Sequence, residues 1–338
     1  MRIVSGTAQL VETPLHRPFV TAQGSADVAR AVQVAIELEN ASVVVGESVP
    51  VSYVTGETIE SVLATCNRIL PHIFDKDLRS WGALLLLIHK LAPNEPSARC
   101  ALEMAVLYGF EKTTYLSPYM LLGGCLNEQV SDITLPMLPE VEAIAQEAWD
   151  KGFRIFKIKV GNPTDDLIRV QRVISTCPRA TLRIDANQAF SPEEAVIFAE
   201  SLQQMSAPVQ MLEQPVTAKD IDGMNWVAER SPIPIFADES LLTPQDALRL
   251  ANTAVHGFNL KINKNGIRGV LDIIPIAKAA GKLLMLGCML ETRHSICFSL
   301  ELALGTGAFD FLDLDSHHLL NEPGENRYFY QVDGMMRL

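Results

Sequence analysis

Two lysines stand two positions apart in an apolar run, and three acids and a further lysine follow them along the chain. Lys157 and Lys159 belong to the run Phe-Lys-Ile-Lys-Val. Side chains at positions i and i+2 of a β-strand point to the same face, so both ammonium groups are predicted to point into one small volume. The later residues each come at the end of a β-like run: Asp185, Glu213, Asp238 and Lys261.

The three acids are predicted to bind one Mg²⁺ ion. Ligation by oxygen alone fits Mg²⁺ better than zinc, which favours the histidine and cysteine that these runs lack. One such acid could equally cap a helix or form a salt bridge, but the same position on three successive strands favours a metal site. Mg²⁺ bound to a substrate carboxylate would acidify the neighbouring C–H by stabilising the enediolate formed when the proton leaves.

The elements that would position these residues are β-like runs separated by helical patterns. Helix starts are marked by Ser191 and Thr243, each followed by proline and, three positions after the cap, by an acid. Eight parallel strands with seven helices between them predict an α/β fold, a TIM-type (β/α)7β barrel. The predicted strands are 131–138, 153–160, 181–187, 209–214, 234–239, 257–262, 282–288 and 309–315.

Strand order in a barrel turns sequence position into spatial position. Strands three, four and five are neighbours, so their acids should meet at the C-terminal rim, where active sites of this fold lie. Lys159 and Lys261, on strands two and six, should face each other across the mouth as two general bases. An amine serves as a base when its pKa is lowered from about 10.4 toward neutrality, and the metal ion and Lys157 both act in that direction. The alternative for Lys-x-Lys is a solvated strand edge.

Residues 1–125 are predicted to form a separate α+β capping domain, because alternating runs are followed by helical periodicity. A long loop at about 13–26 between its first two strands is predicted to act as a lid. The catalytic barrel is predicted at 126–316, and the tail at 317–338 is predicted to return to the capping domain.

Composition excludes several classes of partner. The chain has 338 residues, 48% of them hydrophobic, and a net charge of −12, which disfavours nucleic acid and anionic membranes. Its longest apolar run is too short to span a bilayer and its N-terminus lacks an apolar signal region, so a cytoplasmic protein is predicted. The six cysteines are predicted to be reduced thiols. A homo-oligomer is compatible with the sequence.

The lysines and acids resemble the motifs of the enolase superfamily, in its muconate lactonizing enzyme-like branch, over nearly the whole chain. This resemblance implies proton abstraction next to a carboxylate, but it does not choose among cycloisomerase, o-succinylbenzoate synthase, N-acylamino acid racemase and dipeptide epimerase. Asn187 and Glu239 are predicted to support the metal ligands next to them. The matching motifs are Lys157-Ile158-Lys159, Asp185-Ala186-Asn187, Glu213-Gln214-Pro215, Asp238-Glu239-Ser240 and Lys261-Ile262-Asn263.

Strand eight favours a dipeptide epimerase. Asp313 and Asp315 share one face near its end, and such a pair resembles that of the dipeptide epimerases, where it holds the α-ammonium group of the substrate. Strand eight also lies opposite strand four, so a dipeptide with its carboxylate near Glu213 would extend toward the two aspartates. The predicted reaction is 1,1-proton transfer at the α-carbon of the C-terminal residue. The alternative is two acids at the barrel mouth that bind no ligand.

The lid limits the substrate. In the L-Ala-D/L-Glu epimerases that this chain resembles, an arginine that pairs the glutamate side chain would stand shortly after the lid motif, where this chain has Gln23 and Gly24. A second buried carboxylate would then be unpaired and costly. The second residue is therefore predicted to be apolar or cationic, with Gln23 and Gly24 facing it.

Two alternatives remain open. The first is another enzyme of this branch, an N-acylamino acid racemase or an o-succinylbenzoate synthase. A requirement for a free substrate amine would exclude the racemase, because acylation removes the charge that the aspartates would bind. The second is a barrel that binds a small acid without turnover, which exchange of the α-proton for deuterium would exclude.

Overall fold

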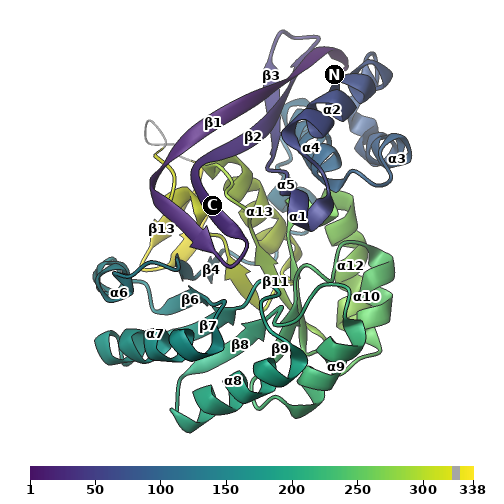
Figure 1. Cartoon of the computed structure of the whole chain (residues 1–338). Coiled ribbons are helices and arrows are strands. Elements are labelled where there is room, and N and C mark those ends of the chain that lie inside the picture. Colours follow the sequence, from purple (N-terminus) through teal and green to yellow (C-terminus); the bar gives the residue numbers. More distant parts are fainter. Residues whose placement is uncertain (322–327) are drawn as a thin grey trace.

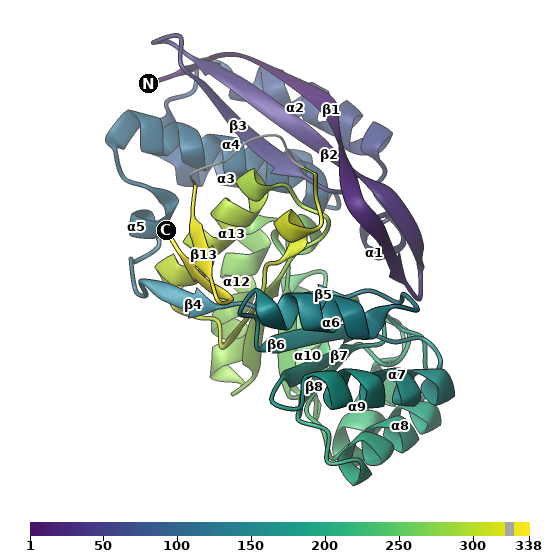
Figure 2. The same ribbon diagram turned by 90° about the vertical axis from the view of Figure 1, so that its left-hand side faces the viewer.

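The computed structural model describes residues 1–321 and 328–338, and it has two layers (Figures 1 and 2). An antiparallel sheet with its helices lies over one end of a parallel β/α barrel. Residues 322–327, part of the predicted C-terminal tail, lie outside the described residues. No helix within the described ranges is long and apolar enough to cross a membrane.

The barrel confirms the predicted fold. Its eight strands pair in chain order, all parallel, and each lies inside one of the eight predicted ranges. A parallel bridge between Ser131 and Leu312 joins the first strand region to the last and closes the ring. The strands are β5 (Ile133–Leu135), β6 (Ile155–Lys159), β7 (Thr181–Asp185), β8 (Val209–Glu213), β9 (Ile235–Ala237), β10 (Gly257–Leu260), β11 (Leu283–Gly287) and β12 (Phe311–Asp313).

Helices connect successive strands on the outside of the barrel. Two of them begin as the sequence indicates, because Ser191 and Thr243 form capping boxes with Glu194 and Asp246. The connecting helices are α6 (Val141–Asp150), α7 (Pro163–Thr176), α8 (Pro192–Gln204), α9 (Ile221–Arg230), α10 (Pro244–Ala251), α11 (Ile262–Asn265) with α12 (Ile267–Ala279), and α13 (Arg293–Thr306).

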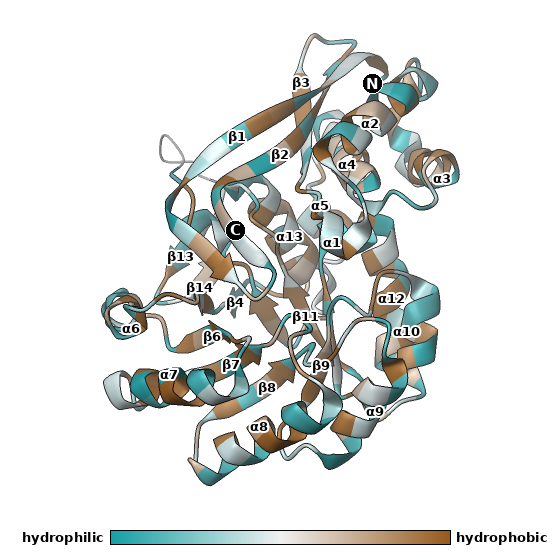
Figure 3. Cartoon of the chain, in the orientation of Figure 1, coloured by the Kyte–Doolittle hydropathy of each residue, from teal (hydrophilic) through white to brown (hydrophobic). Residues whose placement is uncertain are grey.

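Below the acids and lysines, the barrel interior combines an apolar cluster with one buried ion pair. Met211, Phe236 and Met285, with Phe311 packed against them, form the apolar cluster. Arg183 lies over the Phe311 ring and pairs with Asp132. The barrel strands are apolar along much of their length, whereas the outer helices also carry hydrophilic faces (Figure 3).

The N-terminal part contains a meander of three antiparallel strands and several helices that cover it. Buried residues of α2 and α4 pack against the sheet in one continuous core with the barrel. The elements are β1 (Ile3–Thr21), β2 (Gly24–Leu38), β3 (Val43–Ser48), α1 (Ser52–Thr55), α2 (Ile59–Ile73), η1 (Leu78–Ser80), α3 (Trp81–Leu91), α4 (Pro96–Thr114) and α5 (Pro118–Leu121).

The segment at 13–26 is a β-hairpin and not the predicted loop. β1 and β2 pair up to Thr21 and Gly24, with a shift in register between Pro14 and Phe19. The turn needs only two residues, and Gly24 adopts a φ of +145°, which suits glycine. Pro14 and Pro18 are accommodated in β1 because it is an edge strand. The hairpin reaches down from the N-terminal part toward the barrel mouth (Figure 1).

The described part of the C-terminal tail contacts both layers. After η2 (Ser316–His318), Leu320 bridges to Leu15 of β1. The strands that follow residue 328 pair with each other and with β4, which precedes the barrel. These strands are β4 (Glu128–Val130), β13 (Tyr330–Val332) and β14 (Met335–Arg337).

Candidate active site

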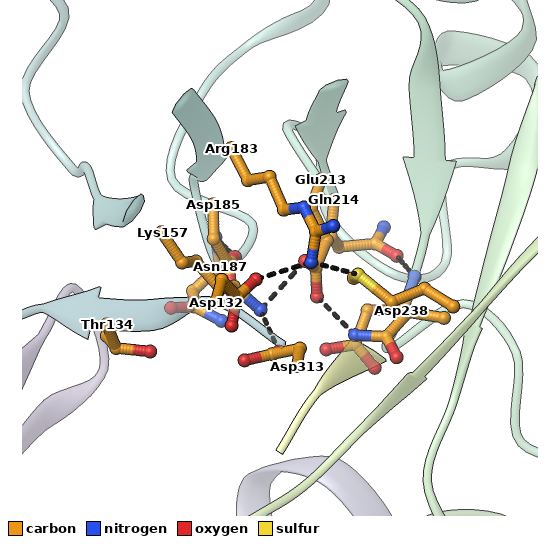
Figure 4. Close-up of polar contacts among 12 residues, drawn as sticks. Asp132, Thr134, Lys157, Arg183, Asp185, Asn187, Glu213, Gln214, Asp238 and Asp313 are labelled. Carbon is orange, nitrogen blue, oxygen red and sulfur yellow. Dashed lines mark hydrogen bonds and ion pairs between the residues drawn. The ribbon is translucent and has the colours of Figure 1, made fainter. Parts of the chain in front are cut away.

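The predicted metal ligands Asp185, Glu213 and Asp238 lie close together at the C-terminal end of the barrel, with Lys157 and Asp313 beside them (Figure 4). Strand register places Lys159 beside Asp185, and Asp185 beside Glu213. Asp238 and Lys261 follow the last residues of β9 and β10, one position beyond each strand. Three neighbouring strand ends therefore present the three acids at one level.

Each of these acids has one oxygen held by a neighbouring donor. The donors differ in kind: a backbone amide, a side-chain amide and an ammonium group. Such contacts fix the orientation of a carboxylate, which is what supporting groups do for metal ligands. They are Asn187 N to Asp185 Oδ1 at 3.0 Å, Asn259 Nδ2 to Glu213 Oε1 at 2.7 Å, and Lys264 Nζ to Asp238 Oδ1 at 2.6 Å.

The other oxygen of each acid faces a lysine. Glu213 Oε2 makes its contact as an ion pair without a well-directed hydrogen bond, so it retains capacity for another partner. The contacts are Lys159 Nζ to Asp185 Oδ2 at 2.7 Å, Lys157 Nζ to Asp185 Oδ2 at 3.0 Å, Lys157 Nζ to Glu213 Oε2 at 2.8 Å, and Lys261 Nζ to Asp238 Oδ2 at 2.7 Å.

These ion pairs oppose the predicted lowering of the lysine pKa values. Burial alone would lower the pKa of Lys159 and of Lys261, but the surrounding carboxylates, Asp185 and Asp238 foremost, together raise both pKa values. Lys157 behaves alike, with its pKa raised well above the ordinary value by carboxylates that overcome burial. In this structure the lysines are therefore ammonium groups. For one of them to act as a base, a cation must bind the carboxylates and offset their negative charge.

The buried charges at the barrel mouth are unbalanced in the direction that favours binding of a cation. Acids exceed cations by two, because seven buried acids stand against five buried cations. Burial, and after it the charge of the neighbouring Asp185, raises the pKa of Glu213 to about 8. A divalent cation would balance the excess of negative charge, and the all-oxygen donor set fits Mg²⁺. The residues counted are Asp132, Asp185, Glu213, Asp238, Glu239, Asp313, Asp315, Lys157, Lys159, Arg183, Lys261 and Lys264.

If the distance between carboxylate oxygens were the only criterion, a different set of three acids would be chosen as the metal site. Among the described residues, Asp132, Asp313 and Asp315 form the one group of three acids whose oxygens lie within 4.8 Å of one another. The predicted trio is wider, since the ammonium group of Lys157 lies between Asp185 and Glu213. Asp132 is a deeper residue that Arg183 pairs at 2.6 Å, and the sequence analysis missed it.

Asp313 and Asp315 both lie at the mouth, but strand eight is shorter than the predicted 309–315: β12 ends at Asp313, and Asp315 lies beyond it. Asp313 Oδ2 accepts a hydrogen bond from Lys157 at 2.6 Å, and Asp315 Oδ2 accepts one from the Thr134 amide at 2.5 Å. Burial, reinforced by Asp313, raises the pKa of Asp315 to about 6. The pair could bind an ammonium group, which would relieve that repulsion.

A cavity of about 320 Å³ lies between this mouth and the N-terminal part. The hairpin closes one side of it: Gln23 Nε2 donates a hydrogen bond to Asn187 O at 2.7 Å, and Gly24 lines the wall. The Phe19 ring stands 6.0 Å from Lys159 Nζ. Asn187 in turn donates to Glu239 at 3.3 Å, so both predicted supporting residues lie at the mouth. The hairpin tip therefore takes the place that the predicted lid was to have.

Two supporting residues, Asn259 and Lys264, were missed by the sequence analysis, and a local pattern could have found only the first. Asn259 precedes Lys261 by two positions and so shares its face on β10. Lys264 is fully buried and also donates to the backbone oxygens of Asp238 and Asn259, at 2.6 and 2.9 Å. Gly287 leaves room for this arrangement, since a Cβ there would lie 2.7 Å from Asn259 Oδ1.

Comparison with known proteins gives one family for this geometry. Residues 140–338 match the family described as enolase C-terminal domain-like. The chain is 35% identical to the L-Ala-D/L-Glu epimerase of Thermotoga maritima, over 100% of this chain and 99% of the relative. It is 32% identical to the aromatic dipeptide epimerase of Herpetosiphon aurantiacus, over 98% and 95%.

A solved structure extends the similarity to three dimensions. The dipeptide epimerase from Enterococcus faecalis, complexed with Mg and the dipeptide L-Leu-L-Tyr, superposes with a TM-score of 0.93 at 30% identity, covering 100% of this chain and 97% of that one. The likeness therefore includes the N-terminal part as well as the barrel.

Proposed function

Because this chain belongs to the enolase superfamily and is an isomerase of its muconate lactonizing enzyme-like branch, we propose that it is a Mg²⁺-dependent dipeptide epimerase. The proposal rests on one observation above the others: a carboxylate trio and an aspartate pair stand on different strand ends of one mouth, with lysines between them. A zwitterionic dipeptide has a carboxylate for the first group and an ammonium for the second.

The chain would hold the substrate by its two charged ends. Asp185, Glu213 and Asp238 would bind Mg²⁺, since each has one oxygen already oriented by a donor. Asp132 is a weaker candidate ligand because Arg183, a permanent cation, pairs it below the mouth. Asp313 and Asp315 would receive the α-ammonium group, as a charge-assisted contact.

The lysines would move the proton. Lys159 and Lys261 stand on β6 and just after β10, on opposite sides of the barrel, so one could remove the α-proton from one face and the other return a proton to the opposite face. Mg²⁺, when bound, would stabilise the enediolate charge and draw off the carboxylate charge that raises the lysine pKa values. Lys157, which contacts three carboxylates, would add positive charge beside the substrate carboxylate.

For the second residue of the dipeptide we propose an apolar or cationic side chain rather than glutamate. At the hairpin tip the residues that line the cavity are neutral: Gln23, Gly24 and Ser25. Arg30 is the arginine among the described residues that line the cavity. Its Nε lies 2.8 Å from Glu12 Oε1, so its charge is already paired. The named relatives include both glutamate-specific and aromatic-specific enzymes, so membership of the family leaves this choice to the pocket.

A dipeptide library incubated with the protein in D₂O and Mg²⁺ tests the proposal. Turnover replaces one α-proton by deuterium, a gain of about one dalton by mass spectrometry, and chiral chromatography follows inversion at the second residue. We expect exchange that EDTA abolishes, and N-acetylated dipeptides should react far more slowly. Equal reaction of the acetylated compounds would favour an N-acylamino acid racemase, and binding without exchange would favour the non-catalytic alternative.

A further inference from the structure

Beside the aspartate pair, the cavity is lined by three chain segments, which contain Thr134, Cys288 and Asp315. Cys288 Sγ lies 3.9 Å from Asp315 Oδ1, and the amide of Thr134 donates to the other oxygen of Asp315. The chain that follows Cys288 and the chain that follows Asp315 both remain at the cavity surface. Their apolar lining residues are Met289, Leu290 and Leu319.

The wall formed by these three residues is apolar and only half-buried. Met289, Leu290 and Leu319 each keep part of their surface exposed, and each lines the cavity. Val28 of the hairpin also lines the cavity, and the bridge between Leu15 and Leu320 joins the hairpin to the tail. Apolar surface of this kind is stabilised when a ligand covers it, by about 25 cal/mol per Å².

The carboxylates at this end can serve one positive charge and no more. Asp313 already accepts a hydrogen bond from Lys157 at 2.6 Å, and one oxygen of Asp315 is used by Thr134. An α-ammonium group would use what is left. A basic side chain on the same residue would bring a second charge to an apolar wall, where it would be unpaired.

An acidic side chain on the first residue of the dipeptide would also lack a strong partner. Arg30 of β2 is the arginine among the described lining residues, but it is paired with Glu12 and its side chain is 63% exposed. Pairing such an exposed arginine contributes little, since water competes for both charges.

We infer that the first residue of the substrate dipeptide carries an apolar side chain larger than a methyl group, of the size of leucine or methionine. This inference rests on the proposed function, because it takes Asp313 and Asp315 as the site of the α-ammonium group. The wall of Met289, Leu290 and Leu319 is its specificity determinant, separate from the hairpin tip that faces the second residue.

Varying only the first residue of the dipeptide tests the inference. The second residue is kept at the one that exchanges fastest in the library, and the first is alanine, leucine, methionine, lysine or glutamate. Leucine or methionine should exceed the other three in kcat/KM by about tenfold or more, the scale of a few methylene groups in an apolar pocket. Exchange that is as fast with alanine, lysine or glutamate overturns this inference and leaves the proposed function standing. Absence of exchange with every dipeptide overturns both.

Variants locate the determinant. Leu290→Ala should lower the ratio of kcat/KM for leucine over alanine as first residue about tenfold, and Leu290→Glu should shift the preference toward lysine. Leu248→Ala, on the exposed face of α10 and outside the cavity, is the matched control and should keep the wild-type ratio. An unchanged ratio in both Leu290→Ala and Met289→Ala, with folding verified by circular dichroism, would overturn the assignment of this wall.

Discussion

At the scale of single residues, each of the three predicted metal ligands has one oxygen held by a supporting donor and the other facing a lysine. One oxygen of Asp238 is held by Lys264 and the other contacts Lys261. Because the first contact orients the carboxylate and the second can be exchanged, a cation can replace a lysine without moving the acid. Substitution of the acid is therefore expected to affect metal binding, and substitution of the lysine is expected to affect proton transfer.

Glu213→Gln should weaken Mg²⁺ binding by more than the ten- to hundredfold that loss of a supporting group typically costs. The amide oxygen of glutamine can still accept from Asn259, which keeps the fold, but the variant loses a ligand charge. Calorimetric titration with Mg²⁺ measures the effect without relying on activity. Glu200→Gln, an exposed acid of α8, is the control, and equal affinity in the two variants would contradict a ligand role for Glu213.

Lys159→Ala and Lys261→Ala should each abolish epimerisation, since each removes the proton carrier on one face. Either variant can still exchange the α-proton of a single epimer with solvent. Following deuterium uptake into the separate L,L and L,D dipeptides by NMR distinguishes these cases. Uptake into both epimers by one single variant would refute the arrangement of two bases.

At the scale of elements, the hairpin formed by β1 and β2 brings residues of the N-terminal part to the candidate active site. Its tip is fixed by the bond from Gln23 to the carbonyl of Asn187, a residue held at a φ of +42° directly after β7. A side chain in the turn thus faces the strand ends, and a change of one residue there alters the pocket and leaves the barrel intact.

Gln23→Arg should raise kcat/KM for Ala-Glu over wild type by about tenfold or more, because a charge-assisted contact contributes roughly 1.5–3 kcal/mol. Steady-state kinetics with Ala-Glu and with an apolar dipeptide measure the change in preference. Gln23→Ala removes the same hydrogen bond to Asn187 without adding charge and separates the two effects. If both variants shift the preference equally, the missing arginine is not what excludes glutamate.

At the scale of the whole molecule, buried polar groups join the N-terminal part to the barrel. The Val49 amide donates to Asn263 Oδ1 at 2.6 Å, and Ser97 Oγ donates to Asn263 O at 3.0 Å. Glu103 of α4 accepts from the Arg268 amide of α12 at 3.0 Å, while its other oxygen has no hydrogen-bond partner. Burial raises the pKa of Glu103 to about 7, against the effect of that amide.

This shift predicts a pH dependence of stability. The unfolded chain ionises Glu103 near its ordinary pKa of 4.5, whereas the folded protein does so only near 7. Its contribution is therefore full below pH 4.5 and lost as the pH rises toward 7, by on the order of 3 kcal/mol. Glu103→Gln should lose correspondingly less stability between pH 5 and pH 8 in denaturant unfolding. Parallel pH profiles for wild type and variant would contradict this role.

Local pattern determined much of this protein. The alternation of apolar runs and capped helices predicted all eight barrel strands, because parallel β/α units repeat the same signals in sequence. The same repetition brought the acids and lysines to one rim, since each comes at the end of its run. Asp185, Glu213 and Asp238 could therefore be assigned to one mouth without any knowledge of their contacts.

Tertiary structure alone decided the charge state of the site and the form of the hairpin. Lys157 and Asp313 are 156 positions apart, and only their contact, with those of Asp185 and Glu213, shows that the ammonium form is stabilised. The segment at 13–26 was predicted as a loop, whereas pairing between β1 and β2 makes it a hairpin, and the prolines at 14 and 18 are tolerated there because β1 lies at an edge. Asp132 and Lys264 carry no local signal of their roles. Electrostatics and edge pairing arise between residues distant in sequence, so the sequence pattern does not determine them.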